Sequence, residues 1–312
     1  MMEYCFGIDV GGTTVKCGLF RTDGTLEEKW EIPTRTENHG EAILPDIAAS
    51  ILEKMKERGI TREMTAGVGV DVPGPVNENG EVPCAVNLHW GYKHIAREME
   101  ALTGLKAKAA NDANAAALGE SWRGGAAGIP NVLMATLGTG VGGGIIVDGR
   151  IVCGAHGSGG EIGHANVEPE ETEYCNCGNQ GCLEQMTSAT GIVRLAKKEL
   201  KSSDDSSVLR QSQVTAKAVF DAYKQGDELA GRVVKKFASY LGRGLAIFAC
   251  VTDPEVILIG GGVSKAGEPL IEAVQQEYRK AAFPTCKDTP IKLAVLGNDA
   301  GIYGAAKLVL QG

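Results

Sequence analysis

The residues with the most distinctive chemistry lie in one short stretch, from Gly160 to Glu184. Its one histidine and three cysteines are His164, Cys175, Cys177 and Cys182. Imidazole and thiolate are the ligands of closed tetrahedral zinc sites, which have no open position for a substrate. Gly178 and Gly181 supply the backbone freedom that a tight metal-binding turn needs. The stretch therefore predicts a structural Zn²⁺ site, with incidental thiols beside a core histidine as the alternative.

Two glycine-rich turns, each between two strand-like apolar runs, are the next candidates. The first, Gly11-Gly12-Thr13, follows Asp9, and the second is Gly138-Thr139-Gly140. Because a strand and not a helix follows each turn, neither is a Walker or a Rossmann motif. Backbone N–H groups and the Thr13 hydroxyl can donate to phosphate oxygens, and Asp9 can face a hydrated Mg²⁺. The repeat indicates a duplicated ATPase, although a plain hairpin explains the first turn equally well.

Polar residues at the ends of other strand-like runs are candidates for substrate binding. Asn111-Asp112 follows one run and begins an alanine-rich helix. Ligands of open α/β sheets lie at the carboxyl ends of strands, so Asp112 is a candidate general base, with a simple helix N-cap as the alternative. Asn87 and Trp90 lie in a predicted loop and are candidate substrate contacts; a loop asparagine bonded to its own backbone is the alternative.

A third glycine-rich stretch, Gly260-Gly261-Gly262, joins a strand-like run at 255–259 to a predicted helix at 269–282. Three glycines would let a nucleotide lie against the backbone. A β–α turn without a ligand is the alternative. Further helices are predicted at 41–58, 187–200, 215–226 and 228–250, from the spacing of apolar residues.

The composition fits an ordinary globular protein. The 312 residues are 43% hydrophobic and 22% charged, which suits two domains. The net charge is −8 and Lys and Arg are not clustered, so we expect no nucleic-acid partner. Nine cysteines without a signal peptide, and no apolar run long enough to span a bilayer, predict a cytoplasmic protein with no membrane partner.

Together these motifs resemble those of the ROK sugar kinases (repressor, open reading frame, kinase). The matching segments follow the family's order over nearly the whole chain: 9–16, 111–112, 138–144, 161–164, the three cysteines with Glu184, and 260–264. Within the family, 85–90 and 182–184 are most similar to the ATP-dependent glucokinases of bacteria.

The resemblance implies a two-domain actin-like, hexokinase-like α/β ATPase fold, with ribonuclease H-like domains, an interdomain cleft and a homodimer. The expected domains are 1–120 with 299–312, and 121–298, which carries the zinc motif and the dimer surface. A sugar-responsive regulator of the same family would need a helix-turn-helix ahead of Asp9, and Asp9 lies too near the N-terminus for one.

The implied reaction moves the γ-phosphoryl group of ATP to the 6-hydroxyl of glucose, with Asp112 as the base. The residues implied to bind the sugar are Asn87, Asn111, Asp112, Glu161, His164 and Glu184. Those implied to bind ATP and Mg²⁺ are Asp9, Gly11, Gly12, Thr13, Lys16, Gly138, Thr139, Gly140, Gly260, Gly261 and Gly262. One ring nitrogen of His164 would bind structural Zn²⁺, so that the other carries a proton for a sugar hydroxyl. N-acetylmannosamine, N-acetylglucosamine, fructose and allose stay open as alternative sugars, and polyphosphate stays open as the donor.

Overall fold

The computed structural model describes residues 2–211 and 213–311, and their contacts divide the chain into two compact units. Unit 1 comprises Met1–Pro130, Gly144–Gly160 and Leu296–Gly312, and unit 2 comprises Asn131–Gly143 and Glu161–Val295. These units differ from the domain bounds expected from the sequence, which gave 121–130, 144–160 and 296–298 to the second domain. The contact between strand β10 (Arg150–Ile151) and helix α4 (Asp112–Arg123) is one reason why 144–160 groups with unit 1.

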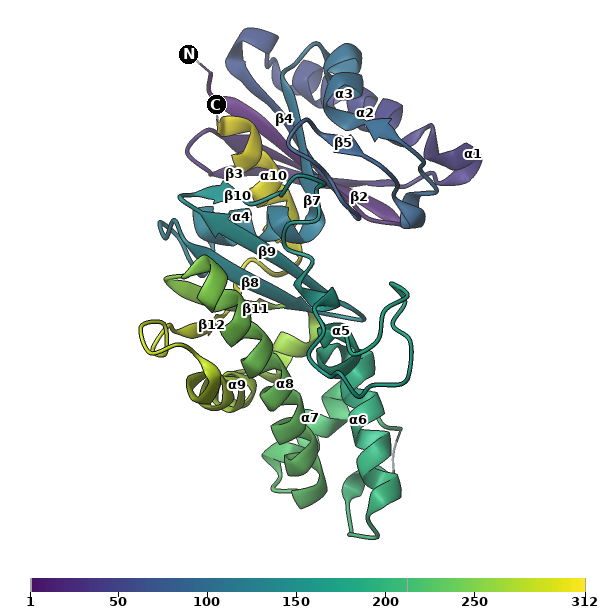
Figure 1. The fold of residues 1–312 in the computed structure, drawn as a ribbon. Helices are drawn as coiled ribbons and strands as arrows, with labels where there is room; N and C mark the ends of the chain where they lie inside the picture. The colour runs from purple at the N-terminus through teal and green to yellow at the C-terminus, as the bar shows by residue number, and fades with distance from the viewer. Residues whose placement is uncertain (1, 212, 312) are drawn as a thin grey trace. The chain divides into compact units, whose positions relative to one another are not determined.

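Unit 1 contains a five-stranded sheet with the order β3-β2-β1-β4-β7. The strands are β1 (Tyr4–Val10), β2 (Thr14–Arg21), β3 (Leu26–Pro33), β4 (Thr65–Val72) and β7 (Ala107–Asn111). The first three form an antiparallel meander, and β4 and β7 extend it in parallel (Figure 1). The predicted strand–turn–strand start of the chain is therefore confirmed.

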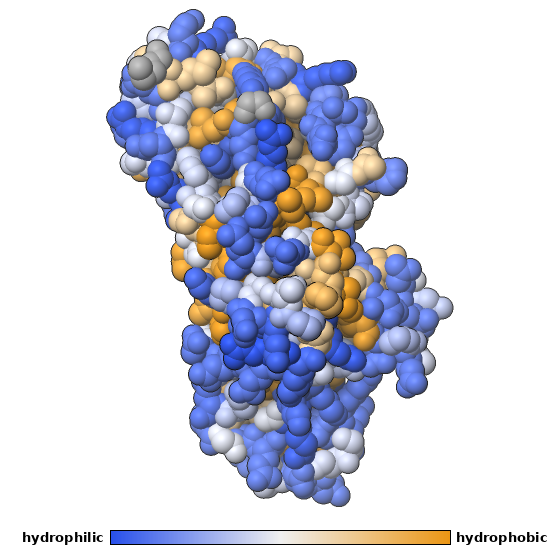
Figure 2. All heavy atoms as spheres, turned by 60° about the vertical axis from the view of Figure 1, so that its left-hand side comes forward, coloured by the Kyte–Doolittle hydropathy of each residue, from blue (hydrophilic) through white to orange (hydrophobic). Residues whose placement is uncertain are grey.

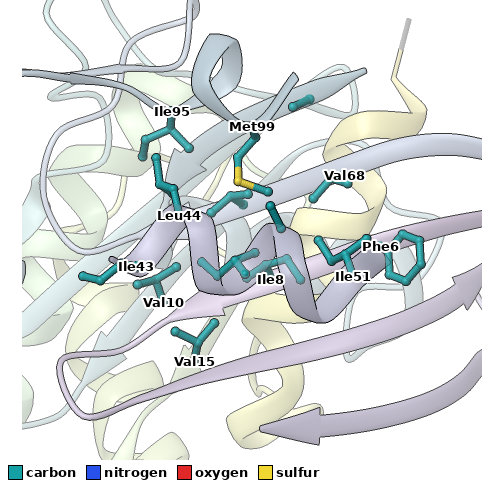
Figure 3. Packing of buried hydrophobic residues seen from close by; sticks show 14 of the residues in the cluster. Phe6, Ile8, Val10, Val15, Ile43, Leu44, Ile51, Val68, Ile95 and Met99 are labelled. Carbon is teal, nitrogen blue, oxygen red and sulfur yellow. The ribbon is translucent and has the colours of Figure 1, made fainter. Parts of the chain in front are cut away.

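Helices α2 (Ile43–Arg58) and α3 (Ile95–Thr103) pack together over the apolar core of this sheet. Figure 3 shows Phe6 of β1 beside Ile51 of α2, and Val10 of β1 beside Ile43 of α2. All four are essentially inaccessible to solvent. Helix α2 ends where Gly59 adopts a left-handed conformation with φ of 65°, close to the predicted end.

Helix α10 (Ala300–Leu310) contacts strands β1 and β4 and also packs along α4. Glycines allow this close approach. A Cβ added to Gly7 or to Gly69 would lie 1.9 or 1.7 Å from a carbonyl oxygen of α10, and one on Gly304 would lie 1.7 Å from the Ala115 oxygen. Backbone thus meets backbone, which brings the start of α10 close to the side chains at the ends of β1 and β4.

The second five-stranded sheet has the order β10-β9-β8-β11-β12, which repeats the antiparallel-then-parallel plan of the first. Its other strands are β8 (Val132–Leu137), β9 (Val141–Val147), β11 (Val256–Gly260) and β12 (Ile291–Leu293). The turn Asp148-Gly149 before β10 has positive φ at both residues, as a tight hairpin requires. A strand, and not a helix, follows Gly138-Thr139-Gly140, so rejecting the Rossmann motif was correct.

Five helices belong to unit 2: α5 (Leu183–Thr187), α6 (Ala189–Ser202), α7 (Ala216–Lys224), α8 (Glu228–Thr252) and α9 (Glu268–Ala281). The single helix predicted at 187–200 is wrong at its start. Ser188 is extended there and its Oγ accepts from the Gly191 N–H at 3.0 Å, so it caps α6 and separates it from α5.

The short elements are α1 (Glu37–Gly40), β5 (Glu81–Val82) and β6 (Lys93–His94), with 3₁₀ turns η1 (Arg62–Met64), η2 (Val86–Leu88), η3 (Ile162–His164), η4 (Val208–Arg210), η5 (Gly262–Ala266) and η6 (Gly297–Asp299). Hydrophilic side chains cover most of the face seen in Figure 2. Among the described residues, no helix combines the length and the apolar character that crossing a membrane requires.

Candidate functional site

Asn111 and Asp112 lie where β7 ends and α4 begins, as predicted. The structure gives the two residues different hydrogen bonds and different exposure. Asn111 is the N-cap, because its side-chain oxygen accepts from the N–H groups of Ala113 and Asn114 at 3.0 and 3.1 Å. Its amide nitrogen donates to Gly74 O at 3.1 Å and to Asp112 Oδ1 at 3.0 Å. Asp112 is exposed in the first turn of the helix. Since Asn111 supplies the cap, Asp112 is left to present a solvent-accessible carboxylate.

The first glycine turn carries a charged pair at its base. Asp9 faces Lys16 across the β1–β2 hairpin, and Lys16 Nζ lies 2.8 Å from Asp9 Oδ2. Burial alone would lower the pKa of Lys16, but the hydrogen bond to Asp9 and the charges of Asp9 and Asp71 raise it. Between these residues, Gly11 N–H donates to Thr14 O at 3.1 Å, which closes a tight turn with Gly12 and Thr13 at its exposed tip.

A third acidic residue, Asp71, lies beside Asp9 in the parallel pairing of β1 and β4. It is fully buried, and neither carboxylate oxygen has a hydrogen-bond partner in the described structure. Burial, reinforced by the charges of Asp9 and Asp112, raises the pKa of Asp71 well above its ordinary value. The sequence interpretation missed this residue, although a carboxylate within an apolar strand was a visible signal.

The loop that contains Asn87 and Trp90 gives each residue a different environment. Asn87 is exposed in η2, so its amide is accessible. Trp90 is buried, and its indole N–H donates to Gly40 O at 3.0 Å. The suggestion that Trp90 contacts a substrate is therefore wrong, because its one polar atom is already used inside the core.

In unit 2, the four predicted zinc ligands meet. One ligand atom from each of His164, Cys175, Cys177 and Cys182 lies within 4.8 Å of all the others. Cys177 Sγ is 3.6 Å from Cys182 Sγ, and Cys175 Sγ is 3.8 Å from His164 Nδ1. Sulfurs in a disulfide are only about 2 Å apart, so the cysteines are free thiols. Ligands about 2.3 Å from a tetrahedral zinc ion lie roughly 3.8 Å apart, so the cluster has the dimensions of such a site.

The protonation of the thiols bears on how well they suit a metal. A hydrogen bond from the Asn179 backbone lowers the pKa of the Cys177 thiol, whereas burial raises the pKa of Cys182 to about 12. A coordinated metal deprotonates a thiol outright. The donor set therefore fits a zinc ion whose own charge ionises the buried ligand.

His164 connects this cluster to a carboxylate. Its Nδ1 faces Cys175, and its Nε2 lies 4.0 Å from Glu161 Oε2. Glu161 is exposed and begins the η3 turn. Glu184, in α5, accepts from Val141 N–H at 2.9 Å, and its other oxygen lies 3.8 Å from Cys175 Sγ. The three predicted sugar-binding residues of unit 2 are thus held around the cysteine cluster, and Glu184 also contacts the second glycine turn.

A cavity of about 460 Å³ in unit 2 brings together two predicted nucleotide segments. Gly138 and Thr139 line it from the second glycine turn, and Gly262 lines it from the third glycine stretch. Gly260 and Gly261 do not line it. Gly260 is the buried end of β11, and Gly261, with φ of 80°, has its Cβ position 2.5 Å from Leu137 O. These two glycines are needed for close packing.

Helix α7 supplies a wall of this cavity that the sequence interpretation missed. Phe220 and Lys224 line it, together with the ion pair of Lys217 and Asp221, whose charged atoms are 2.5 Å apart. An apolar ring beside charged groups suits a heterocyclic base with polar substituents. No local motif marks these residues, because their common position follows from the packing of α7 and not from its sequence.

Comparison with known proteins connects these observations. A profile of the ROK family matches residues 5–312. The chain is 41% identical to a glucokinase of Halalkalibacterium halodurans, over 98% of this chain and 94% of the relative. Its structure is similar to that of a ROK hexokinase from Thermus thermophilus, with a TM-score of 0.79, 33% identity and coverage of 97% and 96% of the two chains.

A ROK family glucokinase from Streptomyces griseus, solved in complex with glucose and AMPPNP, is also similar, with a TM-score of 0.75 and 31% identity over 99% of this chain and all of that one. The expected actin-like, hexokinase-like α/β fold is thereby confirmed. The chain belongs to the ROK family.

Proposed function

We propose that this protein is a glucokinase, which uses ATP to phosphorylate glucose at the 6-hydroxyl. The observation that carries the proposal is the exposed side chain of Asp112 in the first turn of α4, at the carboxyl end of β7. The similarity to two glucokinases, which are 41% and 36% identical to this chain in sequence, supports glucose as the acceptor. The cavity lined by Gly138, Thr139 and Gly262 supports a nucleotide as the donor.

In the reaction, Asp112 accepts the proton of the sugar hydroxyl as its oxygen attacks the γ-phosphorus. An ordinary carboxylate suffices when the transition state is loose, because the proton leaves late. The turns Gly11-Gly12-Thr13 and Gly138-Thr139-Gly140 hold the phosphates through backbone N–H groups, and Asp9 and Lys16 lie at the base of the first turn. Asp9 is the residue that would face a hydrated Mg²⁺, which would supply positive charge to the phosphates.

The proposed contacts to the sugar are Asn87, Asn111, Asp112, Glu161, His164 and Glu184. Ionised carboxylates only accept hydrogen bonds, so Glu161 and Glu184 suit the hydroxyl groups of a hexose. Gly260 and Gly261 act with Gly262 by bringing the backbone near the adenosine.

The metal has a structural role in this scheme. His164, Cys175, Cys177 and Cys182 would hold Zn²⁺; if Nδ1 of His164, which faces Cys175, were the ligand atom, Nε2 on the side of Glu161 would carry the proton. His164→Gln should lose zinc and raise the KM for glucose together, in a metal assay paired with steady-state kinetics. Lost zinc with an unchanged KM would separate the metal from sugar recognition.

The remaining assignments rest on the family resemblance and on composition. The nine cysteines are free in the structure and suit a reducing compartment, so the proposed location is the cytoplasm and the proposed pathway is glycolysis. A homodimer with its surface on unit 2 is the proposed assembly, and light scattering of the purified protein tests it.

A coupled assay with a panel of sugars and two donors tests the function. Glucose with ATP should give the highest kcat/KM among glucose, fructose, allose, N-acetylglucosamine and N-acetylmannosamine, and ATP should exceed polyphosphate. Asp112→Ala should keep its fold and glucose affinity but lose turnover by about 10²–10⁴-fold or more. The exposed Asp204→Asn is the control with unchanged kinetics. A near-normal kcat in folded Asp112→Ala would remove Asp112 as the base, and a better sugar in the panel would replace glucose.

A further inference from the structure

A second large cavity lies in unit 1, and none of the residues proposed for ATP and sugar lines it. Its volume is about 520 Å³, and it is lined by β7, α3, β10 and the end of α10, with the turn before β5. Pockets of about 300–1,000 Å³ are the usual size for small-molecule sites. Strand β7 is the edge strand of its sheet, so this side of it carries no further strand.

Four cationic side chains line this cavity. Lys106 precedes β7 and Lys108 lies within it, two residues apart and therefore on one side of the strand. Arg97 comes from α3 and Arg150 from β10. Among the described residues, none of the four has a carboxylate partner within 4.0 Å, although the chain as a whole carries a net charge of −8. None of the four cations is therefore held in a close ion pair in the described part of the chain, although the charge of Arg97 does act on Glu81.

Three acidic residues also line the cavity, and two of them accept hydrogen bonds from neighbouring groups. Glu100 accepts from the Ala107 backbone N–H at 3.1 Å. Glu81 accepts from Asn77 at 2.6 Å and from the Tyr92 hydroxyl at 2.8 Å. Glu78 also lines the cavity, and its charge helps to raise the pKa of Cys153, after burial. Hydrogen bonds from neutral groups leave these carboxylates ionised, so four cations and three carboxylates line the cavity, with one positive charge in excess.

The electrostatics of Lys108 agree with this excess. Burial lowers the pKa of Lys108, and the charges of Lys106 and Arg150 lower it further. Its ammonium group donates to the Gln311 carbonyl, which is a neutral acceptor. Repulsion among these like charges is unfavourable, and a bound anion would offset it.

We propose that this cavity binds a small phosphate ester with two or more negative charges. Two guanidinium groups can each hold a phosphoryl group through paired hydrogen bonds, and two lysines add compact charges. The site is separate from Asp112 and from the glycine turns, so its ligand is neither the donor nor the acceptor of the proposed reaction. The proposal does not depend on the identity of the sugar.

Calorimetric titration of the whole protein with fructose 1,6-bisphosphate, without ATP, glucose or Mg²⁺, tests the site. The variants are Lys106→Gln and Arg150→Gln, and Lys287→Gln is the control because Lys287 is exposed and does not line this cavity. Each of the two variants should weaken binding by about tenfold or more, since a hydrogen bond to a charged group is lost. The control should bind as the unsubstituted protein does. Glucose phosphorylation by each variant verifies that it is folded, and it is expected to be unchanged.

Three results would overturn the assignment. The first is no binding of the bisphosphate by the unsubstituted protein at millimolar concentration. The second is binding that neither Lys106→Gln nor Arg150→Gln weakens relative to Lys287→Gln, which would place the anion elsewhere. The third is citrate binding as tightly as the bisphosphate, which would indicate a general polyanion surface. Failure of glucose phosphorylation alone would count against the proposed function and leave this site in place.

Discussion

Replacing Asp71 with asparagine should stabilise unit 1. Asp71 is fully buried between β1 and α10 without a hydrogen-bond donor, and Asp9 lies beside it. A Cβ on Gly301 would lie 3.0 Å from Asp71 Oδ2 and 3.1 Å from Asp9 Cγ, so the start of α10 closes over both carboxylates. Asparagine has nearly the same shape, carries no charge and can donate to Asp9. The variant therefore removes a buried charge without opening a cavity.

The size of the effect follows from linkage. The ordinary pKa of the carboxyl is 3.8, and burial with the charges of Asp9 and Asp112 raises it well above that in the folded state. Because this pKa is raised, the contribution of the protonated Asp71 to the free energy of unfolding is fully present below pH 3.8 and is lost as pH rises toward the folded-state pKa. Above pH 3.8, each pH unit lowers the free energy of unfolding by about 1.4 kcal/mol until Asp71 ionises. The loss at pH 7 is therefore at most about 4 kcal/mol. The lower limit of the loss is about 1 kcal/mol, which is the cost of burying a polar group without a hydrogen-bond partner.

Urea unfolding followed by tryptophan fluorescence measures this difference, at pH 5, 6, 7 and 8, without nucleotide. All three tryptophans, Trp30, Trp90 and Trp122, lie in unit 1, so the signal reports the unit that contains Asp71. Asp71→Asn should gain about 1–4 kcal/mol at pH 7 and less at pH 5, whereas the exposed Asp204→Asn should match the wild type. A less stable Asp71→Asn at pH 7, or a gain that does not grow with pH, would refute the reasoning.

Two further substitutions test the metal site and the helix packing. Cys177→Ser should weaken zinc affinity by at least about 100-fold and raise the KM for both glucose and ATP, measured by metal analysis and kinetics; full zinc retention would exclude Cys177 as a ligand. Gly304→Ala places a Cβ 1.7 Å from the Ala115 oxygen and should destabilise unit 1 by about 3 kcal/mol in urea unfolding. Gly231→Ala, in α8 with open space around it, should gain up to about 1 kcal/mol, and equal effects of the two would contradict the packing argument.

Features encoded by neighbouring residues were predicted well. The two hairpin turns and the four-residue metal cluster depend on short spacings and on glycine positions, which determine a turn locally. The choice between cap and base at Asn111-Asp112 stayed open in the sequence, because either residue can cap a helix. Only the observed hydrogen bonds of Asn111 assign the cap to it.

Features that depend on distant segments were not predicted. Asp71 belongs to an apolar run, and nothing near it in the sequence indicates that Asp9 will be its neighbour in the sheet. The wall that α7 adds to the cavity proposed for the nucleotide has the same origin, since nothing in the sequence around Phe220 distinguishes it from other apolar residues of a helical pattern. The break at Ser188 escaped notice because the apolar spacing continues across it, and a cap is decided by one side-chain hydrogen bond.

The contacts of Glu184 indicate that the stretch from Gly160 to Glu184 has a role beyond sugar binding. A Cβ on Gly140 would lie 2.4 Å from Glu184 Oε2, the oxygen that accepts from the neighbouring Val141 N–H. Gly140 is therefore required by the carboxylate, independently of any phosphate. The other oxygen of Glu184 lies 3.8 Å from Cys175 Sγ. One side chain thus connects the cluster of His164 and the three cysteines to the second glycine turn within unit 2. A loosened cluster frees Glu184, and a freed Glu184 no longer holds the turn, so metal loss should affect ATP as well as glucose.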